Sequence, residues 1–256
     1  MRYFMIVLAA LFVSSGLAGE PDKDLHNKCI YPTVMLVSTS PCPSLQGVGT
    51  GVIIKSIKKG AEWYNFIYTV AHNVKWTPTH KCKGADGKEV EEGHYISVHV
   101  GVYEDWSFLD RFEEYDCEVL YKEEDSDLAL LQFISDKEMP AADINNGKVY
   151  IGNDVCRVGC GMGESFRIDF GKITSLPNTA GRVSDRLVNT YRISAPTIQG
   201  DSGGPVYEDN KLIGLAEAIA MIPSEPLSKP IPVCHIAYVI PVEEFLKCEE
   251  IKAFLE

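Results

Sequence analysis

The sequence has few positive charges and no apolar run of membrane-spanning length near its start. It holds 24 Lys and Arg against 36 Asp and Glu, which gives a formal net charge of −12 over 256 residues. A chain of this charge is repelled by phosphate backbones, so nucleic acid is not an expected partner. The apolar run Phe4 to Val13 is too short to cross about 30 Å of hydrocarbon, which argues against a membrane anchor.

The same apolar run has the features of a signal peptide. Arg2 precedes it, and the small residues Ser14 to Gly19 follow it. We expect residues 1–18 to be removed by cleavage after Ala18, and residues 19–256 to be exported to an extracellular or periplasm-like compartment with no stable membrane anchor. The sequence gives no indication of an oligomeric state.

Zinc-ligand spacing is also missing. Cys156 and Cys160 lie four apart but have no partner pair of Cys or His, and the histidines are scattered. We therefore expect no metal and no other cofactor. An even number of cysteines in an exported chain favours up to four disulfides, whose pairing stays open. All eight follow the predicted cleavage site: Cys29, Cys42, Cys82, Cys117, Cys156, Cys160, Cys234 and Cys248.

Short apolar or alternating runs separated by turn residues predict an all-β fold. The runs fall into two sets of about six strands, which favours a double six-stranded β-barrel. The first set covers about residues 30–134: Thr33–Thr39, Gly49–Ser56, Tyr64–Val70, Tyr95–Tyr103, Asp116–Tyr121 and Leu128–Ile134. The second covers about 148–240: Asp154–Gly159, Ser165–Thr174, Val188–Ser194, Pro205–Glu208, Lys211–Ile219 and Cys234–Ile240.

Two other segments complete the predicted architecture. Residues 135–147 are polar, contain Pro140, and are interpreted as a linker between the barrels. Residues 241–256 carry apolar side chains at helical spacing, with Pro241 suited to the first helical position. We expect a packed C-terminal helix there.

The segment Gly200-Asp201-Ser202-Gly203-Gly204-Pro205 surrounds one serine with glycines. Glycines permit a tight turn that exposes the hydroxyl and directs backbone N–H groups to one point. We interpret Ser202 as a nucleophile and the N–H groups of Gly200 and Ser202 as an oxyanion hole. A plain glycine-rich turn is the alternative, but it would not require the whole hexapeptide.

A serine hydroxyl needs a base, and the base needs an orienting group. His72 follows the apolar end of the run Tyr68 to Ala71, where a rigid strand would hold the ring. Without the serine motif, a structural role would be the usual explanation for this single histidine. Asp127 directly precedes the apolar run from Leu128, where a carboxylate can be half buried beside the imidazole. Asp125 is better interpreted as a solvated turn residue.

These three segments resemble the signatures of trypsin-like, chymotrypsin-fold serine proteases, in the order of that family. The resemblance rests on Thr69-Val70-Ala71-His72, Asp127-Leu128-Ala129-Leu130 and the hexapeptide around Ser202. It covers nearly the whole mature chain and implies a triad of His72, Asp127 and Ser202 between the two barrels. Gly49-Thr50-Gly51 and Tyr238–Pro241 look more like the HtrA and V8-type branch than digestive trypsins.

The chain also departs from the digestive trypsins. Asn73 stands where many of them have cysteine, and no Ile-Val-Gly-Gly start follows a basic cleavage site. Activation of the trypsin zymogen type is therefore not expected. Because trypsin-like enzymes pair the aspartate before the serine with a freed α-amine, we hypothesise that Asp201 meets the α-amine created by signal removal.

The resemblance also implies the substrate-binding residues. Pro196 stands six before the serine, where trypsins carry aspartate, so a demand for Arg or Lys is not expected. Ile219 would narrow the pocket, which favours small or medium apolar P1 residues. Glu217 complicates this preference by putting a charge near the pocket, and a rim glutamate that faces solvent is the alternative interpretation. The implied set is Pro196, Gln199, Glu217, Ala218 and Ile219.

Two other function classes were weighed. The segment around Ser202 also matches the G-x-S-x-G turn of α/β-hydrolases, but that turn leads into a helix and is followed by the acid and histidine. Here Pro205 leads into a strand and only His235 follows, so an esterase is not favoured. A catalytically silent relative that binds proteins is the second alternative, although no triad member is missing. The favoured function is a secreted serine endopeptidase acting on proteins or peptides.

Overall fold

The structure is a computed structural model, and it describes residues 22–39, 47–74, 80–83, 89–92, 95–104, 108–176, 190–222 and 231–255. The predicted signal peptide lies outside these residues. Within them, no helix is long and apolar enough to cross a membrane.

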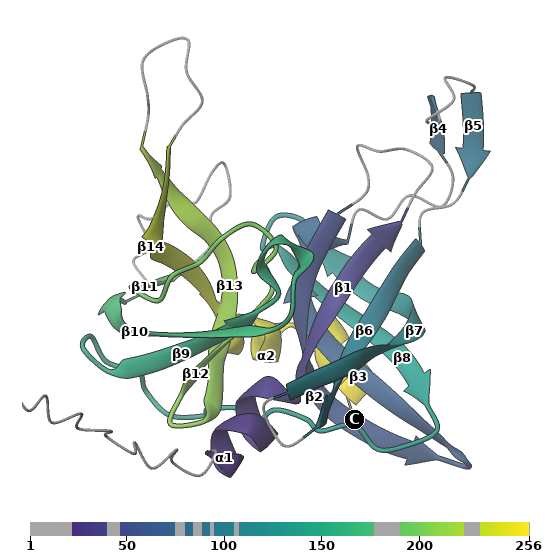
Figure 1. The fold of residues 1–256 in the computed structure, drawn as a ribbon, viewed down its shortest axis with the longest axis horizontal. Coiled ribbons are helices and arrows are strands. Elements are labelled where there is room, and N and C mark those ends of the chain that lie inside the picture. The colour runs from purple at the N-terminus through teal and green to yellow at the C-terminus, as the bar shows by residue number, and fades with distance from the viewer. Residues whose placement is uncertain are drawn as a thin grey trace, which may run out of the picture.

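Six antiparallel strands close the N-terminal barrel in the order β1, β2, β3, β8, β7, β6. They are β1 (Thr33–Thr39), β2 (Gly47–Lys59), β3 (Glu62–Val70), β6 (Tyr95–Glu104), β7 (Phe108–Glu123) and β8 (Leu128–Ser135). Figure 1 shows this barrel in purple to teal. A short pair not predicted from the sequence, β4 (His80–Lys83) with β5 (Glu89–Glu92), projects from it.

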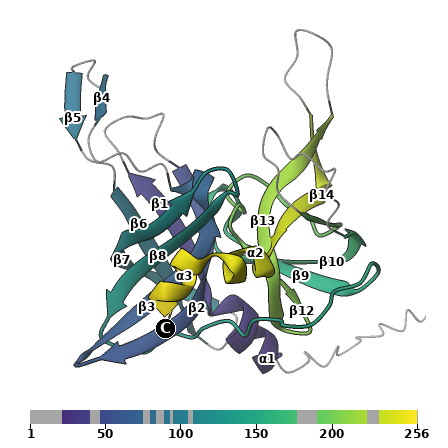
Figure 2. The ribbon, with the colours of Figure 1, turned by 180° about the vertical axis from the view of Figure 1, so that it is seen from behind.

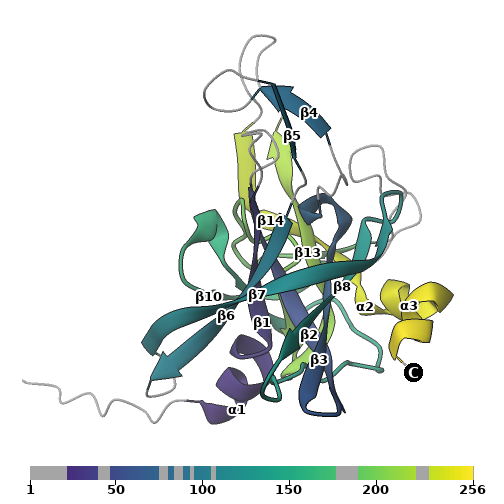
Figure 3. The same cartoon turned by 90° about the vertical axis from the view of Figure 1, so that its right-hand side faces the viewer.

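Six further strands close the C-terminal barrel in the order β10, β11, β14, β13, β12, β9. They are β9 (Asp154–Gly159), β10 (Arg167–Ser175), β11 (Tyr191–Ile193), β12 (Pro205–Glu208), β13 (Lys211–Ile222) and β14 (Ile231–Pro241). The predicted all-β double six-stranded barrel is confirmed. The long strands β13 and β14 extend beyond the barrel at the same end as β4 and β5 (Figure 3).

Each barrel has its own core, and a third core lies between the two barrels. Strand β8 shows how one segment of sequence contributes to two of these cores. Ala129, Leu131 and Phe133 pack inside the N-terminal barrel, whereas Leu128 and Leu130 pack in the core shared with the C-terminal barrel. Because successive strand residues point to opposite faces, the unbroken apolar run of β8 serves two cores.

The connection between the barrels is anchored on both sides. Ala142 N–H donates to the Ile53 carbonyl of β2, and Asn145 N–H donates to the Leu212 carbonyl of β13. The side chain of Ala142 is buried in the shared core. The segment between β8 and β9 therefore helps to fix how the barrels meet.

The C-terminal segment forms two short helices, α2 (Val242–Lys247) and α3 (Glu249–Leu255), which lie across the back of the molecule (Figure 2). The predicted C-terminal helix is confirmed, but it is divided in two at Cys248, which has an extended backbone with ψ of 111°. Pro241 is not the first helical residue. It pairs with Gly214 as the last residue of β14, and its ψ is 141°.

Phe245 anchors these helices. Its ring stacks on Tyr68 of β3 at a centroid distance of 4.3 Å, and its side chain is fully buried in the shared core. Phe254 of α3 is instead 42 % exposed.

We expect Phe245→Ala to lower the free energy of unfolding by about 3–5 kcal/mol, because it opens a cavity between the barrels. The matched control Phe254→Ala removes the same atoms from an exposed site and should change it by less than about 0.5 kcal/mol. Urea denaturation followed by fluorescence measures both. Equal effects of the two substitutions would contradict this packing.

Candidate active site

His72 and Asp127 meet at the end of the N-terminal barrel. His72 lies in the 3₁₀ turn η3 (Ala71–Asn73) directly after β3, and Asp127 directly precedes β8, which pairs with β3. His72 Nδ1 is 2.7 Å from Asp127 Oδ2, and the His72 backbone N–H donates to Oδ1 at 2.9 Å. The carboxylate is fully buried, whereas the imidazole is about one third exposed. Asp127 thus fixes both the backbone and the ring of His72.

Asp127 has a left-handed backbone, with φ of 57°. Its carbonyl also accepts a hydrogen bond from Ala71 N–H at 3.0 Å. Aspartate tolerates this conformation better than most residues, and such backbone strain concentrates at functional sites. Asp125, the candidate set aside, is exposed in the preceding turn.

Ser202 lies in a turn between β11 and β12 on the other barrel. Gly200 and Gly203 have φ of 97° and 81°. A Cβ on Gly203 would lie 2.1 Å from the Thr50 carbonyl oxygen and 2.3 Å from Thr69 Oγ1, so the turn requires glycine there.

The peptide groups around Ser202 are held in place by their carbonyls. Gln199 C=O accepts from Met162 N–H at 2.7 Å, and Gly200 C=O accepts from Thr50 Oγ1 at 2.8 Å. Within the described residues, the N–H groups of Gly200 and Ser202 donate to no protein acceptor. Both therefore remain available to a substrate oxygen.

Two residues of the N-terminal barrel connect the halves of the site. Thr50 N–H donates to the Ser202 carbonyl at 2.8 Å, and Asn73 Nδ2 donates to the same carbonyl at 2.7 Å. Asn73 Nδ2 also donates to Thr69 Oγ1 at 3.1 Å. The sequence marked Asn73 only as a missing cysteine, but its amide ties the His72 turn to the serine.

The Ser202 hydroxyl donates to the Glu217 carbonyl at 3.3 Å. No hydrogen bond between Ser202 and His72 is formed among the described residues. Catalytic hydrogen bonds are often long or unmade until substrate binds, so this arrangement is compatible with a nucleophile and its base.

Cys160 lies beside the same loop without competing with the serine. Its thiol contacts Thr50 Oγ1 at 3.0 Å and the Gly49 carbonyl at 3.1 Å. Burial raises the pKa of Cys160 to about 11. The thiol is therefore protonated at neutral pH and is a poor nucleophile.

The predicted substrate-binding residues lie on both sides of the serine turn. Pro196 is half-buried and Gln199 is exposed on the segment before the serine, while Ala218 and Ile219 are half-buried on β13. Glu217 is only 4 % exposed. The alternative interpretation of Glu217 as a solvent-facing rim residue is therefore wrong, because the side chain on β13 is buried in the protein.

The hypothesis that Asp201 meets a freed α-amine is not supported by the contacts of this carboxylate. Asp201 is fully buried and already has two cationic partners within the chain, Arg157 and Arg167. The sequence indicated neither arginine as part of the site.

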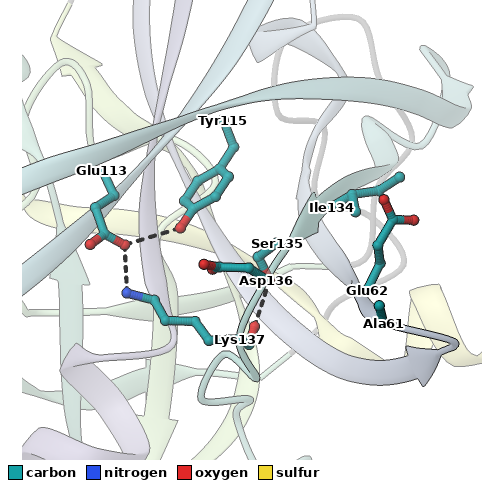
Figure 4. A pocket seen from close by; sticks show the side chains of 8 residues that line it. All are labelled: Ala61, Glu62, Glu113, Tyr115, Ile134, Ser135, Asp136 and Lys137. Atoms are coloured by element: carbon teal, nitrogen blue, oxygen red, sulfur yellow. Dashed lines mark hydrogen bonds and ion pairs between the residues drawn. The ribbon is translucent and has the colours of Figure 1, made fainter.

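A hollow of about 540 Å³ lies away from this constellation, on the side of the N-terminal barrel (Figure 4). Two of its charged groups bind each other. Glu113 binds Lys137 at 2.6 Å and Tyr115 at 3.0 Å, and Lys137 lowers the pKa of Glu113. None of its lining residues belongs to the predicted site, so its size does not make it the reactive centre.

Comparison with known families decides the assignment of the chain. The model of the trypsin-like peptidase domain matches residues 49–215, which hold His72, Asp127 and Ser202. The chain belongs to the trypsin-like peptidase family. The resemblance predicted from the three motifs is thus confirmed at this level, while the branch within the family stays a prediction.

The fold of this trypsin-like chain is also found among solved structures. A crystal structure of Deg5 matches with a TM-score of 0.62 and 14 % identity, covering 88 % of this chain and 90 % of that one. At this identity the likeness shows the fold alone. No curated protein matched the sequence.

Proposed function

We propose that this chain is a serine endopeptidase that uses Ser202, His72 and Asp127 as its triad. The observation that carries the proposal is the fixed His72–Asp127 pair, with Nδ1 to Oδ2 at 2.7 Å and the histidine backbone bound to Oδ1. Such a carboxylate selects the imidazole tautomer that leaves Nε2 free to accept a proton. Membership of the trypsin-like peptidase family supports protein or peptide substrates.

In this mechanism Ser202 Oγ attacks the scissile carbonyl carbon while His72 Nε2 takes the hydroxyl proton. The N–H groups of Gly200 and Ser202 stabilise the oxyanion. His72 then gives the proton to the leaving amine, which departs and leaves an acyl group on Ser202. Water, deprotonated by the same imidazole, hydrolyses this ester and restores the serine.

A silent relative that only binds proteins is the alternative function. Two features favour catalysis over it. The available N–H groups of Gly200 and Ser202 have no protein acceptor among the described residues, and the buried Asp127 is costly to keep unless its partner needs it.

Hydrolysis of an unfolded protein such as casein tests this function. Ser202→Ala should abolish hydrolysis, and Asp127→Asn should lower kcat by about 10⁴ because the imidazole loses its tautomer. Asp125→Asn is the matched control, since it makes the same change in an exposed turn and should leave kcat within about twofold. If the wild type fails to cleave, or if Ser202→Ala cleaves equally well, the proposal is wrong.

We also propose a preference for small or medium apolar P1 residues, supported by Pro196 and by the half-buried Ile219. A peptide library varied at P1 should give the highest kcat/KM for Ala- or Val-sized residues. Ile219→Gly removes a side chain from the pocket and should raise kcat/KM for a P1 Phe about tenfold. The buried carboxylate of Glu217 is the group that would favour a basic P1 residue instead. If Arg or Lys is the preferred P1 residue, the proposed specificity is wrong.

Export and oxidation are proposed as well. The thiols of Cys29 and Cys156 lie in the core between the barrels, and the neighbouring Cys156 raises the pKa of Cys29. Among the described residues the cysteines are free thiols, and Cys42 and the Cys82 side chain lie outside that description. Oxidation by an exogenous disulfide such as oxidised glutathione would join the two sulfurs and reduce that disulfide to two thiols.

We expect the exported protein to begin at Gly19 and to contain a Cys29–Cys156 bridge. N-terminal sequencing and non-reducing peptide mapping by mass spectrometry measure both. A retained residue 1–18 segment would contradict export by cleavage, and two free thiols after incubation with oxidised glutathione would contradict the bridge.

A further inference from the structure

One arginine is buried beside the nucleophile turn. Arg157, on β9, has no exposed surface and is the bulkiest of the fully buried side chains in the described residues. Burial lowers the pKa of this guanidinium, while Asp201 and Asp169 oppose that effect. A buried charge is retained only with paired and hydrogen-bonded partners, so the partners of Arg157 indicate what it does.

Its partners come from three elements. Asp169, directly across from Arg157 on β10, binds Nη2. Nε donates to the Pro196 carbonyl at 2.9 Å. Nη1 forms an ion pair of 2.8 Å with Asp201 Oδ1, without the linear geometry of a hydrogen bond.

The second oxygen of Asp201 holds the chain before the serine. Oδ2 accepts from Ile198 N–H at 2.8 Å, and Asp201 N–H donates to the Ile198 carbonyl at 3.1 Å. The guanidinium of Arg157 therefore binds both ends of the segment 196–201, at the Pro196 carbonyl and at the Asp201 carboxylate. Gly200 lies between these points, and Ser202 follows at once.

Two further features are built around this contact. Arg167 approaches Asp201 Oδ2 at 3.1 Å from the solvent side and is 39 % exposed. A Cβ on Gly159 would lie 2.5 Å from Arg157 Nη1 and 2.6 Å from Asp201 Oδ1. Because only glycine leaves this space, the strand is shaped to let the two charges touch.

We propose that Arg157 is a positioning residue: it neutralises Asp201 and holds residues 196–201 so that Gly200 N–H and Ser202 are presented to substrate. This inference rests on the proposed peptidase function. Arg157 supplies Asp201 with a cation from within the chain, so Asp201 does not need a terminal ammonium as its partner. Arg167, partly solvated, has a lesser share in the same task.

The test compares kcat and KM of the full mature chain on one peptide substrate, per folded molecule as measured by near-UV circular dichroism. Arg157→Met should lower kcat at least a hundredfold and change KM less than fivefold, because the oxyanion contact is made only in the transition state. The kcat of Arg157→Lys should be at least fivefold higher than that of Arg157→Met, because lysine restores the positive charge but not the forked N–H donors of the guanidinium. Arg167→Met should lower kcat less than tenfold.

Arg111→Met is the matched control, since Arg111 is 59 % exposed on the other barrel and should keep kcat within twofold. If Arg157→Met does not fold, the neutral pair Arg157→Met/Asp201→Asn carries the test and should fold with kcat at least tenfold below wild type. A folded Arg157→Met protein, or a folded double variant, with kcat within threefold of wild type would overturn the proposal. Absence of activity in the wild type would instead refute the peptidase function itself.

Discussion

The packing of one barrel on the other is the constraint on which the site depends. His72 and Asp127 belong to the N-terminal barrel and Ser202 to the C-terminal one, so no single barrel holds the constellation. The shared core fixes their relation, with Tyr68 of β3 stacked on Phe245 of α2. At the mouth of this core, Thr50 and Asn73 bind the Ser202 carbonyl, as described above. Apolar burial thus sets the distance between the barrels, and a few hydrogen bonds set the register of the reactive groups.

Two buried carboxylates hold the parts of the site in place, and each binds a partner on its own barrel. Asp127 orders His72 in the N-terminal barrel, and Asp201 is ordered by Arg157 in the C-terminal barrel. Loss of one member of such a buried pair typically costs about 3–5 kcal/mol, because the remaining charge is left in a poorly solvating interior. Each barrel thereby fixes its own part of the site. The glycines at 159, 200 and 203 supply the space and the backbone conformations that these contacts need.

The features read correctly from the sequence are those encoded locally. Twelve barrel strands follow from period-two alternation and turn residues, and the Ser202 turn follows from its glycines. The features that were missed depend on contacts between distant segments. Arg157 looked like one polar residue in a strand, and its partner Asp201 lies on another element. A charged residue between the apolar Cys156 and Val158 was the available signal for a buried ion pair. The orientation of Glu217 was misjudged because nothing local distinguishes a buried acid from a rim acid.

The central claim is that the surroundings of Ser202 make its hydroxyl a nucleophile. Mass spectrometry of the folded mature protein after treatment with a fluorophosphonate tests this most directly. The account predicts a single phosphonyl adduct, mapped to the peptide containing Ser202 and missing from Ser202→Ala and from denatured protein. A folded protein that takes up no adduct, or that carries it on another residue, would contradict the account.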